Sequence, residues 1–184
     1  MTPTYKNKNE VKLSAPYYSQ FIDVTDSFWM LRACGAVCMK IVGESLGKEM
    51  KDIVLICKEA EAKGGYDMIN GWVHDYMVSY MQECGFDCYR KEGLTTIDEI
   101  VASPDKGNPV IVSVEKRVLE QKRFHMITVV GYTASSLIYH ESESTDKTRG
   151  AYRTCDLSTF MEYFRGKAIF VSRQERQTLD ACPA

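Results

Sequence analysis

The sequence predicts an α+β fold in one domain, and three observations lead to this prediction. Its 184 residues suit a single compact domain, because domains usually hold roughly 100 to 200 residues. Apolar residues in the first half recur at the spacing of one helix face, whereas β-branched and aromatic runs bounded by Gly, Pro, Ser and Asp occupy the second half. A helical half followed by a stranded half is typical of the α+β class. The whole chain, 1–184, is therefore expected to be one domain with a core at about 16–172 between polar tails.

Two amphipathic helices are predicted in the first half. One begins near Lys48 and ends at Gly64, where freedom at positive φ suits a turn. The other begins after a predicted N-cap at Asn70 and stops at Gly85. Its apolar face holds Trp72, Val73, Tyr76, Met77, Tyr80, Met81 and Cys84. His74 falls on the opposite, polar face and is expected to be a solvated surface residue.

Four strands are predicted in the second half, at 109–115, 124–132, 137–141 and 167–172. They are expected to pair into an antiparallel sheet. A short helix from about Leu157 to Arg165, capped by Asp156, precedes the last strand. Two polar stretches, 116–123 and 142–150, are predicted to be loops.

Composition and charge exclude several classes of protein. Hydrophobic residues at 45% and charged residues at 26% are typical of a globular chain and not of a disordered one. The net charge of −2 leaves no basic excess to neutralise a phosphate backbone, so nucleic acid is not expected as a partner. No stretch approaches the ~18 consecutive apolar residues of a membrane span. The polar start lacks the apolar core of a secretion signal, so the chain as it stands is expected in the cytoplasm, or outside the cell if an upstream signal was removed.

The cysteines direct attention to one position. Seven is an odd number in a chain too long to need disulfide staples, which favours reduced thiols. The segment 32–42 predicts a largely buried helix with Cys34 in its first turn. There the unpaired N–H groups and the positive end of the helix dipole stabilise a thiolate, which makes Cys34 a candidate nucleophile.

A thiolate nucleophile needs a proton donor for the leaving group, and the chain offers three histidines. His74 is expected at the surface, and His140 lies within a short strand with no evident role. His125 begins a long apolar strand directly after a charged stretch, where a polar side chain is expected only if it faces a cleft or has a partner. His125 is therefore the candidate general acid and base, with a buried structural histidine as the alternative.

In order along the chain, several short motifs resemble a known family. They are Tyr17-Tyr18-Ser19-Gln20, Trp29, Cys34-Gly35, Gly71-Trp72-Val73, Gly107-Asn108-Pro109-Val110-Ile111-Val112 and His125-Met126-Ile127-Thr128-Val129-Val130-Gly131-Tyr132. Their order and spacing are similar to those of the papain-like cysteine peptidases related to the bacteriocin-processing, double-glycine leader peptidases, over roughly 16–172. The resemblance implies a papain-like fold in which the Cys34 helix packs on the C-terminal antiparallel sheet. It also implies a thiol peptidase that acts on a peptide or protein without a cofactor or metal.

The resemblance assigns a role to each matching residue. It implies Cys34 as the nucleophile and His125 as the general acid and base. It further implies that the Gln20 side chain completes an oxyanion hole with the backbone N–H of Cys34. Donors fixed near a carbonyl oxygen stabilise the charge that develops there, and losing one typically costs ~10²-fold or more in rate.

The residue that orients His125 has two candidates. The family has an Asp or Asn on the next strand, and Glu141 matches its spacing from the histidine; a carboxylate there would fix the imidazole tautomer. However, a four-residue connection at 133–136 with regular pairing would turn His140 and Ser142 toward His125 instead. A three-residue loop or a β-bulge would restore Glu141.

Two alternative functions stay open at this point. An inactive papain-like domain that binds peptides or a protein is favoured by Glu in place of the family's Asp or Asn, and by Ala36 where relatives usually have Pro. A zinc-stabilised module would use thiols at spacings within the zinc range, namely Cys34, Cys38, Cys84 and Cys88. Cys38 and Cys84 are equally well explained as small core residues.

Overall fold

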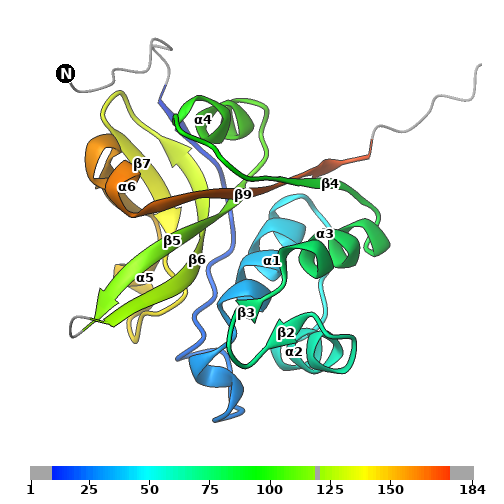
Figure 1. Cartoon of the computed structure of the whole chain (residues 1–184). Helices are drawn as coiled ribbons and strands as arrows, with labels where there is room; N and C mark the ends of the chain where they lie inside the picture. Colours follow the sequence, from blue (N-terminus) through cyan, green and yellow to red (C-terminus); the bar gives the residue numbers. More distant parts are fainter. Residues whose placement is uncertain (1–9, 119–120, 175–184) are drawn as a thin grey trace, which may run out of the picture.

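An antiparallel sheet forms the centre of the fold in the computed structural model, which describes residues 10–118 and 121–174 (Figure 1). Within these residues, seven strands make up the sheet in the order β4-β9-β5-β6-β7-β8, and β1 pairs with β6 outside this path. The strands are β1 (Val11–Lys12), β4 (Phe86–Lys91), β5 (Val110–Val118), β6 (Gln121–Tyr132), β7 (Ser136–His140), β8 (Arg153–Asp156) and β9 (Phe164–Arg173). A separate ribbon pairs β2 (Tyr66–Asp67) with β3 (Gly71–Trp72).

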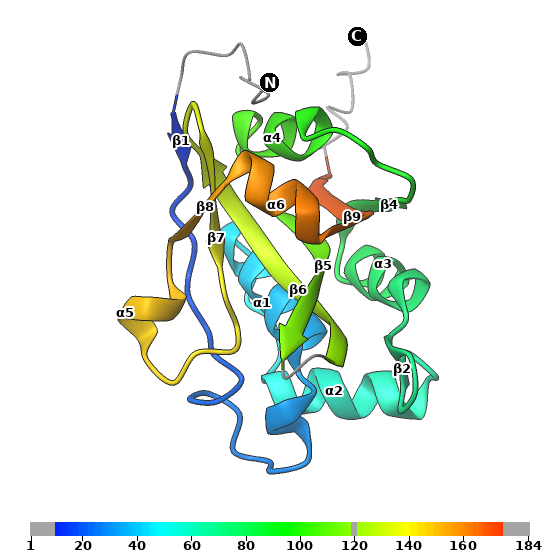
Figure 2. The same cartoon turned by 60° about the vertical axis from the view of Figure 1, so that its left-hand side comes forward.

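Helices cover both faces of the sheet (Figures 1 and 2). They are the 3₁₀ turn η1 (Trp29–Leu31) and the α-helices α1 (Cys34–Ser45), α2 (Ile53–Ala62), α3 (His74–Glu83), α4 (Asp98–Asp105), α5 (Lys147–Gly150) and α6 (Leu157–Tyr163). On one face, α1 lies against β5 and β6 and is flanked by α2 and α3. On the other face, α4 and α6 pack against the sheet.

The core has two parts, one on each face of the sheet. Ile111 belongs to the apolar cluster shared with α1, α2 and α3, whereas Val110 and Val112 belong to the cluster shared with α4 and α6. This alternation is the period-two geometry of a strand buried on both sides. The predicted α+β class, with the Cys34 helix packed on an antiparallel sheet, is confirmed.

The start of the third helix differs from the prediction. Asn70 is not an N-cap, because Gly71–Trp72 pairs with Tyr66–Asp67 in the β2–β3 ribbon and α3 begins only at His74. The Asp67 side chain accepts from the Asn70 backbone N–H at 2.6 Å and so closes the turn of the ribbon. Similarly, α2 begins at Ile53 and not near Lys48.

The charged stretch 116–123 is mostly not a loop. β5 and β6 pair along it from Val110↔Val129 to Val118↔Gln121, so it is the end of a long hairpin. The 142–150 stretch contains the short helix α5, and α6 ends at Tyr163 because β9 begins at Phe164. Strands β1, β4 and β8 and helix α4 are additions to the predicted set.

Part of the predicted N-terminal tail belongs to the sheet. Val11–Lys12, which belongs to the predicted N-terminal tail, pairs with β6 as strand β1. The predictions for 1–9 and 175–184, which include Cys182, lie outside the described residues. None of the helices in the described ranges has the length and apolar character that crossing a membrane requires.

Candidate active site

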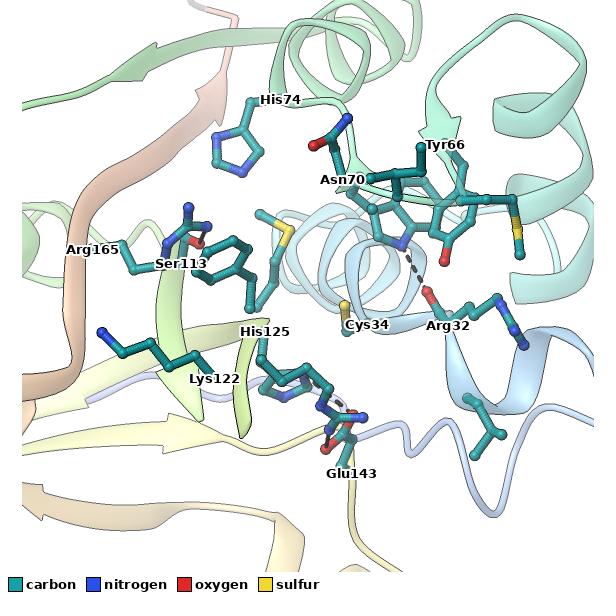
Figure 3. A pocket seen from close by; sticks show the side chains of 18 residues that line it. Arg32, Cys34, Tyr66, Asn70, His74, Ser113, Lys122, His125, Glu143 and Arg165 are labelled. Atoms are coloured by element: carbon teal, nitrogen blue, oxygen red, sulfur yellow. Dashed lines mark hydrogen bonds and ion pairs between the residues drawn. The ribbon is translucent and has the colours of Figure 1, made fainter. Parts of the chain in front are cut away.

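A cleft of about 390 Å³ brings Cys34 and His125 together (Figure 3). Its walls come from the N-terminus of α1, from the β2–β3 ribbon, and from strands β5, β6 and β9. Trp72 lines it on the ribbon side, and Ser113 and Arg165 line it on the sheet side. Residues far apart in the sequence therefore share one opening.

Cys34 is the first residue of α1, and nothing on the helix competes for the first-turn N–H groups. The N-cap, Ala33, has no side chain that can accept a hydrogen bond, and the first turn holds no acidic residue. The unpaired N–H groups and the helix dipole therefore act on the Cys34 thiol and on any oxygen bound beside it. This is the environment that favours a thiolate.

Trp72 fixes the backbone on both sides of Cys34. Its indole Nε1 donates to the Arg32 carbonyl oxygen at 2.8 Å. Its ring also covers Gly35 so closely that a Cβ there would lie 2.4 Å from Trp72 Cδ2. Glycine follows the cysteine because no side chain fits beneath the indole.

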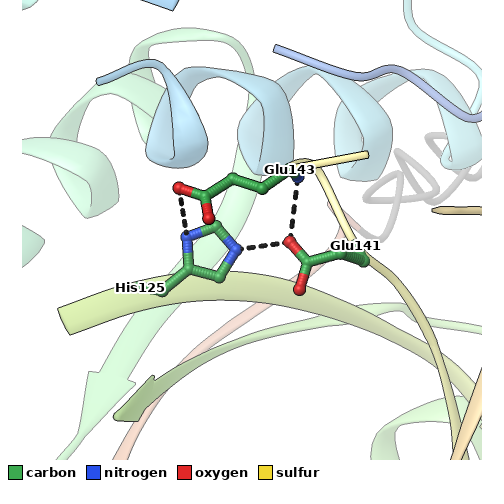
Figure 4. A group of neighbouring side chains, drawn as sticks. All are labelled: His125, Glu141 and Glu143. Carbon is green, nitrogen blue, oxygen red and sulfur yellow. Dashed lines mark hydrogen bonds and ion pairs between the residues drawn. The ribbon is translucent and has the colours of Figure 1, made fainter. Parts of the chain in front are cut away.

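His125 is held by Glu141, with Nε2 of the imidazole 2.7 Å from Oε1 of the carboxylate (Figure 4). Both side chains are almost fully buried. The Glu141 carboxylate is itself held by the Glu143 backbone N–H at 2.9 Å and by Lys116 Nζ at 2.8 Å. With Nε2 engaged in this way, Nδ1 is the ring nitrogen left for chemistry.

A β-bulge between β6 and β7 places Glu141 on the side of His125. Tyr132 pairs with Leu137 across a four-residue connection, but beyond the bulge the register shifts and Val129 pairs with Tyr139. Val130 is the extra residue of β6, and its carbonyl accepts from the Leu13 N–H at 2.8 Å. Because side chains alternate along a strand, one extra residue exchanges the two faces of β6 relative to β7.

The charge state of the pair follows from burial and mutual attraction. Burial acts to lower the pKa of His125, but Cys34 and Glu141 outweigh it and raise the pKa to about 9. Burial acts to raise the pKa of Glu141, but His125 and Lys116 outweigh it and lower the pKa below its ordinary value. At neutral pH the two side chains form an imidazolium–carboxylate ion pair.

Glu143 is a member of this group that the sequence analysis did not identify. Its Oε1 lies 3.6 Å from His125 Nδ1, on the side of the ring opposite Glu141. Its other oxygen contacts Lys116 at 3.0 Å and also Arg123. The period-two spacing from Glu141 was the available signal, but it required a strand to extend past the predicted end at 141.

No metal site of the predicted cysteine type is present in the parts of the chain that the structure describes. The one potential ligand cluster of three or more groups found there is His125, Glu141 and Glu143. Lys116 contacts both of its carboxylates, so the cluster is an ion-pair network without need of a cation. Cys38 and Cys88 are buried free thiols whose pKa values burial raises, as expected of core residues.

Gln20 is not among the described residues that line the cleft. Its side chain is fully buried. Nε2 donates to the Met30 carbonyl at 2.9 Å, and Oε1 accepts from Ser142 Oγ at 3.3 Å. The backbone N–H of Gln20 donates to the Ser142 carbonyl at 2.8 Å, which ties this segment to the end of β7. The amide carries a second N–H proton, which these contacts leave available.

The other two histidines, His74 and His140, do not lie where the sequence suggested. His140 does not contact His125: its Nδ1 accepts from the Tyr152 N–H at 3.0 Å, and its Nε2 lies 3.4 Å from the Ala15 carbonyl oxygen. Burial lowers the pKa of His140 to about 4, so it is a neutral structural residue. His74 was expected at the solvated surface, but it lines the cleft, and burial lowers its pKa.

Comparison with known proteins identifies the family. A sequence model described as the Peptidase_C39 like family matches residues 12–167. A structure of a putative C39-like peptidase from Bacillus anthracis has a TM-score of 0.66 at 13% identity, covering 91% of this chain and 100% of that one. The peptidase domain of Streptococcus ComA, a bi-functional ABC transporter involved in quorum sensing, has a TM-score of 0.59 at 18% identity, covering 78% and 93%.

A third structure extends the likeness. A double glycine motif protease from an AMS/PCAT transporter, solved in complex with the leader peptide, has a TM-score of 0.62 at 10% identity, covering 94% of this chain and 99% of that one. No curated protein matches the sequence significantly. At these identities the solved structures establish the papain-like fold, and the sequence model spans most of the chain. This protein belongs to the Peptidase_C39 like family.

Proposed function

We propose that this protein is a cysteine peptidase that cleaves a peptide or amide bond with Cys34 as its nucleophile. One observation carries the proposal: Cys34, at the uncapped N-terminus of α1, and His125, held by Glu141, line the same cleft. A thiol, an imidazole and a carboxylate in this order are the arrangement by which a nucleophile is activated and its base oriented.

The resting state is an ion pair. The raised pKa of His125 keeps its imidazole protonated at neutral pH, and the imidazolium stabilises the neighbouring Cys34 thiolate together with the helix dipole. Glu141 stays on Nε2, so the acidic proton that faces the cleft is on Nδ1.

Attack by the thiolate converts the substrate carbonyl into a tetrahedral intermediate with charge on its oxygen. The Cys34 backbone N–H and the second amide proton of Gln20 are the donors for this oxygen. Met30 and Ser142 hold the Gln20 amide on both sides, and because the side chain is fully buried, this role requires the amide to become accessible to the substrate oxygen.

Collapse of the intermediate breaks the C–N bond and leaves a thioester on Cys34. His125 gives its Nδ1 proton to the leaving amine and then takes a proton from water, whose oxygen attacks the thioester and releases the acid. The thiolate and the imidazolium are regenerated, so protons and electrons balance over the cycle. Glu141 acts through His125 and is a positioning residue.

A peptide is the proposed substrate. The related double glycine motif protease was solved with a leader peptide bound, which supports peptide binding by this fold. The exposed apolar side chains of Met68 and Ile69, on the ribbon beside the cleft, offer further contact surface for an extended chain.

An inactive peptide-binding domain is the second candidate, and Glu143 is the observation that favours it. Its carboxylate lies 3.6 Å from His125 Nδ1, where it competes with Cys34 for the proton that catalysis uses. In that case the cleft would bind a peptide without cutting it.

Digestion of a diverse peptide library, followed by mass spectrometry, tests the proposal. Wild-type protein should generate new termini, and Cys34→Ala and His125→Ala should each lose at least ~10²-fold of this activity while retaining the wild-type circular dichroism. Equal cleavage by Cys34→Ala would overturn the assignment of the nucleophile. Peptides retained by wild-type protein but left uncut would instead support the inactive domain.

A further inference from the structure

Arg165 is a cation built into one wall of the cleft. It lies on β9, and Nη1 of its guanidinium is 3.0 Å from Oγ of Ser113, a β5 residue that is 2% exposed. The guanidinium carbon is 3.4 Å from the centroid of the Phe124 ring. Stacking on an aromatic face and a buried hydroxyl fix the orientation of the guanidinium plane before any ligand arrives.

Burial lowers the pKa of Arg165, and the charges of Glu115 and Glu92 act against this lowering. In the described parts of the chain, no carboxylate lies within ion-pair distance of its guanidinium. The other basic residues on the same side of the cleft differ in this respect, since Arg123 contacts Glu143 and Lys122 Nζ lies 3.7 Å from Glu115. Among the described residues, Arg165 therefore forms no direct ion pair, and its guanidinium has more N–H donors than the one bond to Ser113 uses.

Basic side chains outnumber acidic ones among the described residues that line the cleft, although the chain carries a net −2. The cleft is lined by four Lys or Arg side chains, and its one acidic lining residue is Glu143. Burial first, and then the charges of Lys167, Arg90 and Arg165, lower the pKa of His74 at this end of the cleft. Figure 3 shows His74, Ser113 and Arg165 grouped on one side of Cys34, with Arg32 on the other.

We infer that Arg165 binds a carboxylate of the peptide that occupies the cleft, with Ser113 and Phe124 as its positioning residues. This inference rests on the proposed function, because it assumes a peptide next to Cys34. A guanidinium presents a planar fork of N–H donors that matches a carboxylate. The carboxylate comes either from an Asp or Glu side chain or from the C-terminus of the peptide.

A peptide library that varies one position at a time tests the inference. It is made in two forms, with free and with amidated C-termini, and is digested by wild-type protein, Arg165→Gln, Arg165→Glu and the matched control Lys167→Gln. Lys167 lies two residues along β9 and pairs with Glu92 at 3.4 Å, but it does not line the cleft.

The expected result is a preference of about 10- to 100-fold in kcat/KM for a carboxylate at one position, in wild type and in Lys167→Gln. The preference should vanish in Arg165→Gln and reverse toward Lys in Arg165→Glu. A preference that survives amidation assigns the carboxylate to a side chain, and one that amidation removes assigns it to the C-terminus. Cleavage without an acidic preference, or one that Arg165→Gln retains, would overturn the inference and leave the peptidase proposal standing.

Binding separates this inference from a failure of the peptidase proposal. The same library is passed over immobilised Cys34→Ala protein and over Cys34→Ala with Arg165→Gln, and the retained peptides are identified. If wild type cuts nothing but acidic peptides are retained only with Arg165 present, the carboxylate subsite holds and the peptidase proposal fails. Retention that ignores acidic residues would refute the subsite as well.

Discussion

The indole of Trp72 lies on Gly35, the residue that follows the candidate nucleophile, and its Nε1 donates to Arg32, two residues before Cys34. The position of the thiol is therefore set from the β2–β3 ribbon as well as from α1. One wall of the cleft and the start of the nucleophile helix are therefore in direct contact through Trp72.

Gly35→Ala should displace Trp72 and with it the segment around Cys34. Overpacking of this kind typically costs ~1–3 kcal/mol, and we expect a lower Tm, a shifted tryptophan emission and a reduced kcat/KM. Trp72→Phe provides the control, because the smaller ring makes room for the added methyl. The double variant should lose less stability than the sum of the single variants, whereas strict additivity would show that the two residues are not coupled.

Iodoacetamide should modify Cys34 before the other described thiols. Burial raises the pKa values of Cys38 and Cys57 and leaves them unreactive, whereas Cys34 lines the cleft beside a protonated His125. We expect labelling at Cys34 to persist below pH 7 and to slow by about 10-fold or more in His125→Gln, because an unperturbed thiol has a pKa of ~8.5. Site-resolved mass spectrometry as a function of pH is the measurement. Slow labelling spread over several cysteines would argue against an activated thiolate.

Glu141→Gln should preserve the hydrogen bond to His125 but remove the charge that helps to raise its pKa. Since His125 must be protonated to release the amine, the alkaline limb of the kcat/KM profile should move to lower pH. Glu141→Ala, which also removes the hydrogen bond, should lose ~10²-fold or more in kcat/KM. An unchanged pH profile in both variants would show that Glu141 does not orient or charge His125.

Stability should depend on pH through the same two residues. The pKa of His125 is raised from 6.5 to about 9, so its contribution is fully present below pH 6.5 and is lost as the pH rises through about 9. The pKa of Glu141 is lowered from 4.5, so its contribution is present above that value and is lost as the pH falls further. The Tm difference between wild type and His125→Gln should be largest between these limits and shrink toward pH 9. A difference that is constant from pH 5 to pH 10 would contradict the ion pair.

Gln20→Leu separates an oxyanion role from a structural one. Loss of an oxyanion donor typically lowers kcat by ~10²-fold with little change in KM. Loss of the hydrogen bonds to Met30 and Ser142 lowers Tm by itself. A variant with a lower Tm but an unchanged kcat would show that Gln20 stabilises the fold and has no part in the oxyanion hole.

The parts of the fold with strong periodicity could be predicted from the sequence, and the parts set by tertiary contacts could not. The helix of Cys34 and the hairpin that carries His125 have long apolar patterns that decide their type. Trp72 fits a helical pattern equally well, and only its pairing across the ribbon with Tyr66 makes it a strand residue. That misassignment also hid His74, which the true start of α3 brings to the cleft.

At the candidate site, too, predictions could be made from local sequence context, whereas the partner of His125 depended on tertiary contacts. Cys34 and His125 stand out by local sequence context, but the choice between Glu141 and His140 depends on one unpaired residue in the neighbouring strand. Glu143 had only its period-two spacing from Glu141 as a signal, and it lay in a predicted loop, where a carboxylate is ordinarily solvated. Arg165, on β9, contacts Ser113 of β5 and Phe124 of β6, and these contacts form only when the sheet assembles.

The extra residue at the β-bulge, Val130, sets the register that brings Glu141 to His125. Removing one residue there would leave every side chain of the site in the sequence, yet it would present His140 and Ser142 to His125 in place of Glu141. Deletion of this one residue would therefore abolish the proposed peptidase activity and leave the overall fold in place. Among chains of similar sequence, the length of the β6–β7 hairpin would then distinguish active members from inactive ones. It would do so more reliably than the presence of the cysteine and the histidine.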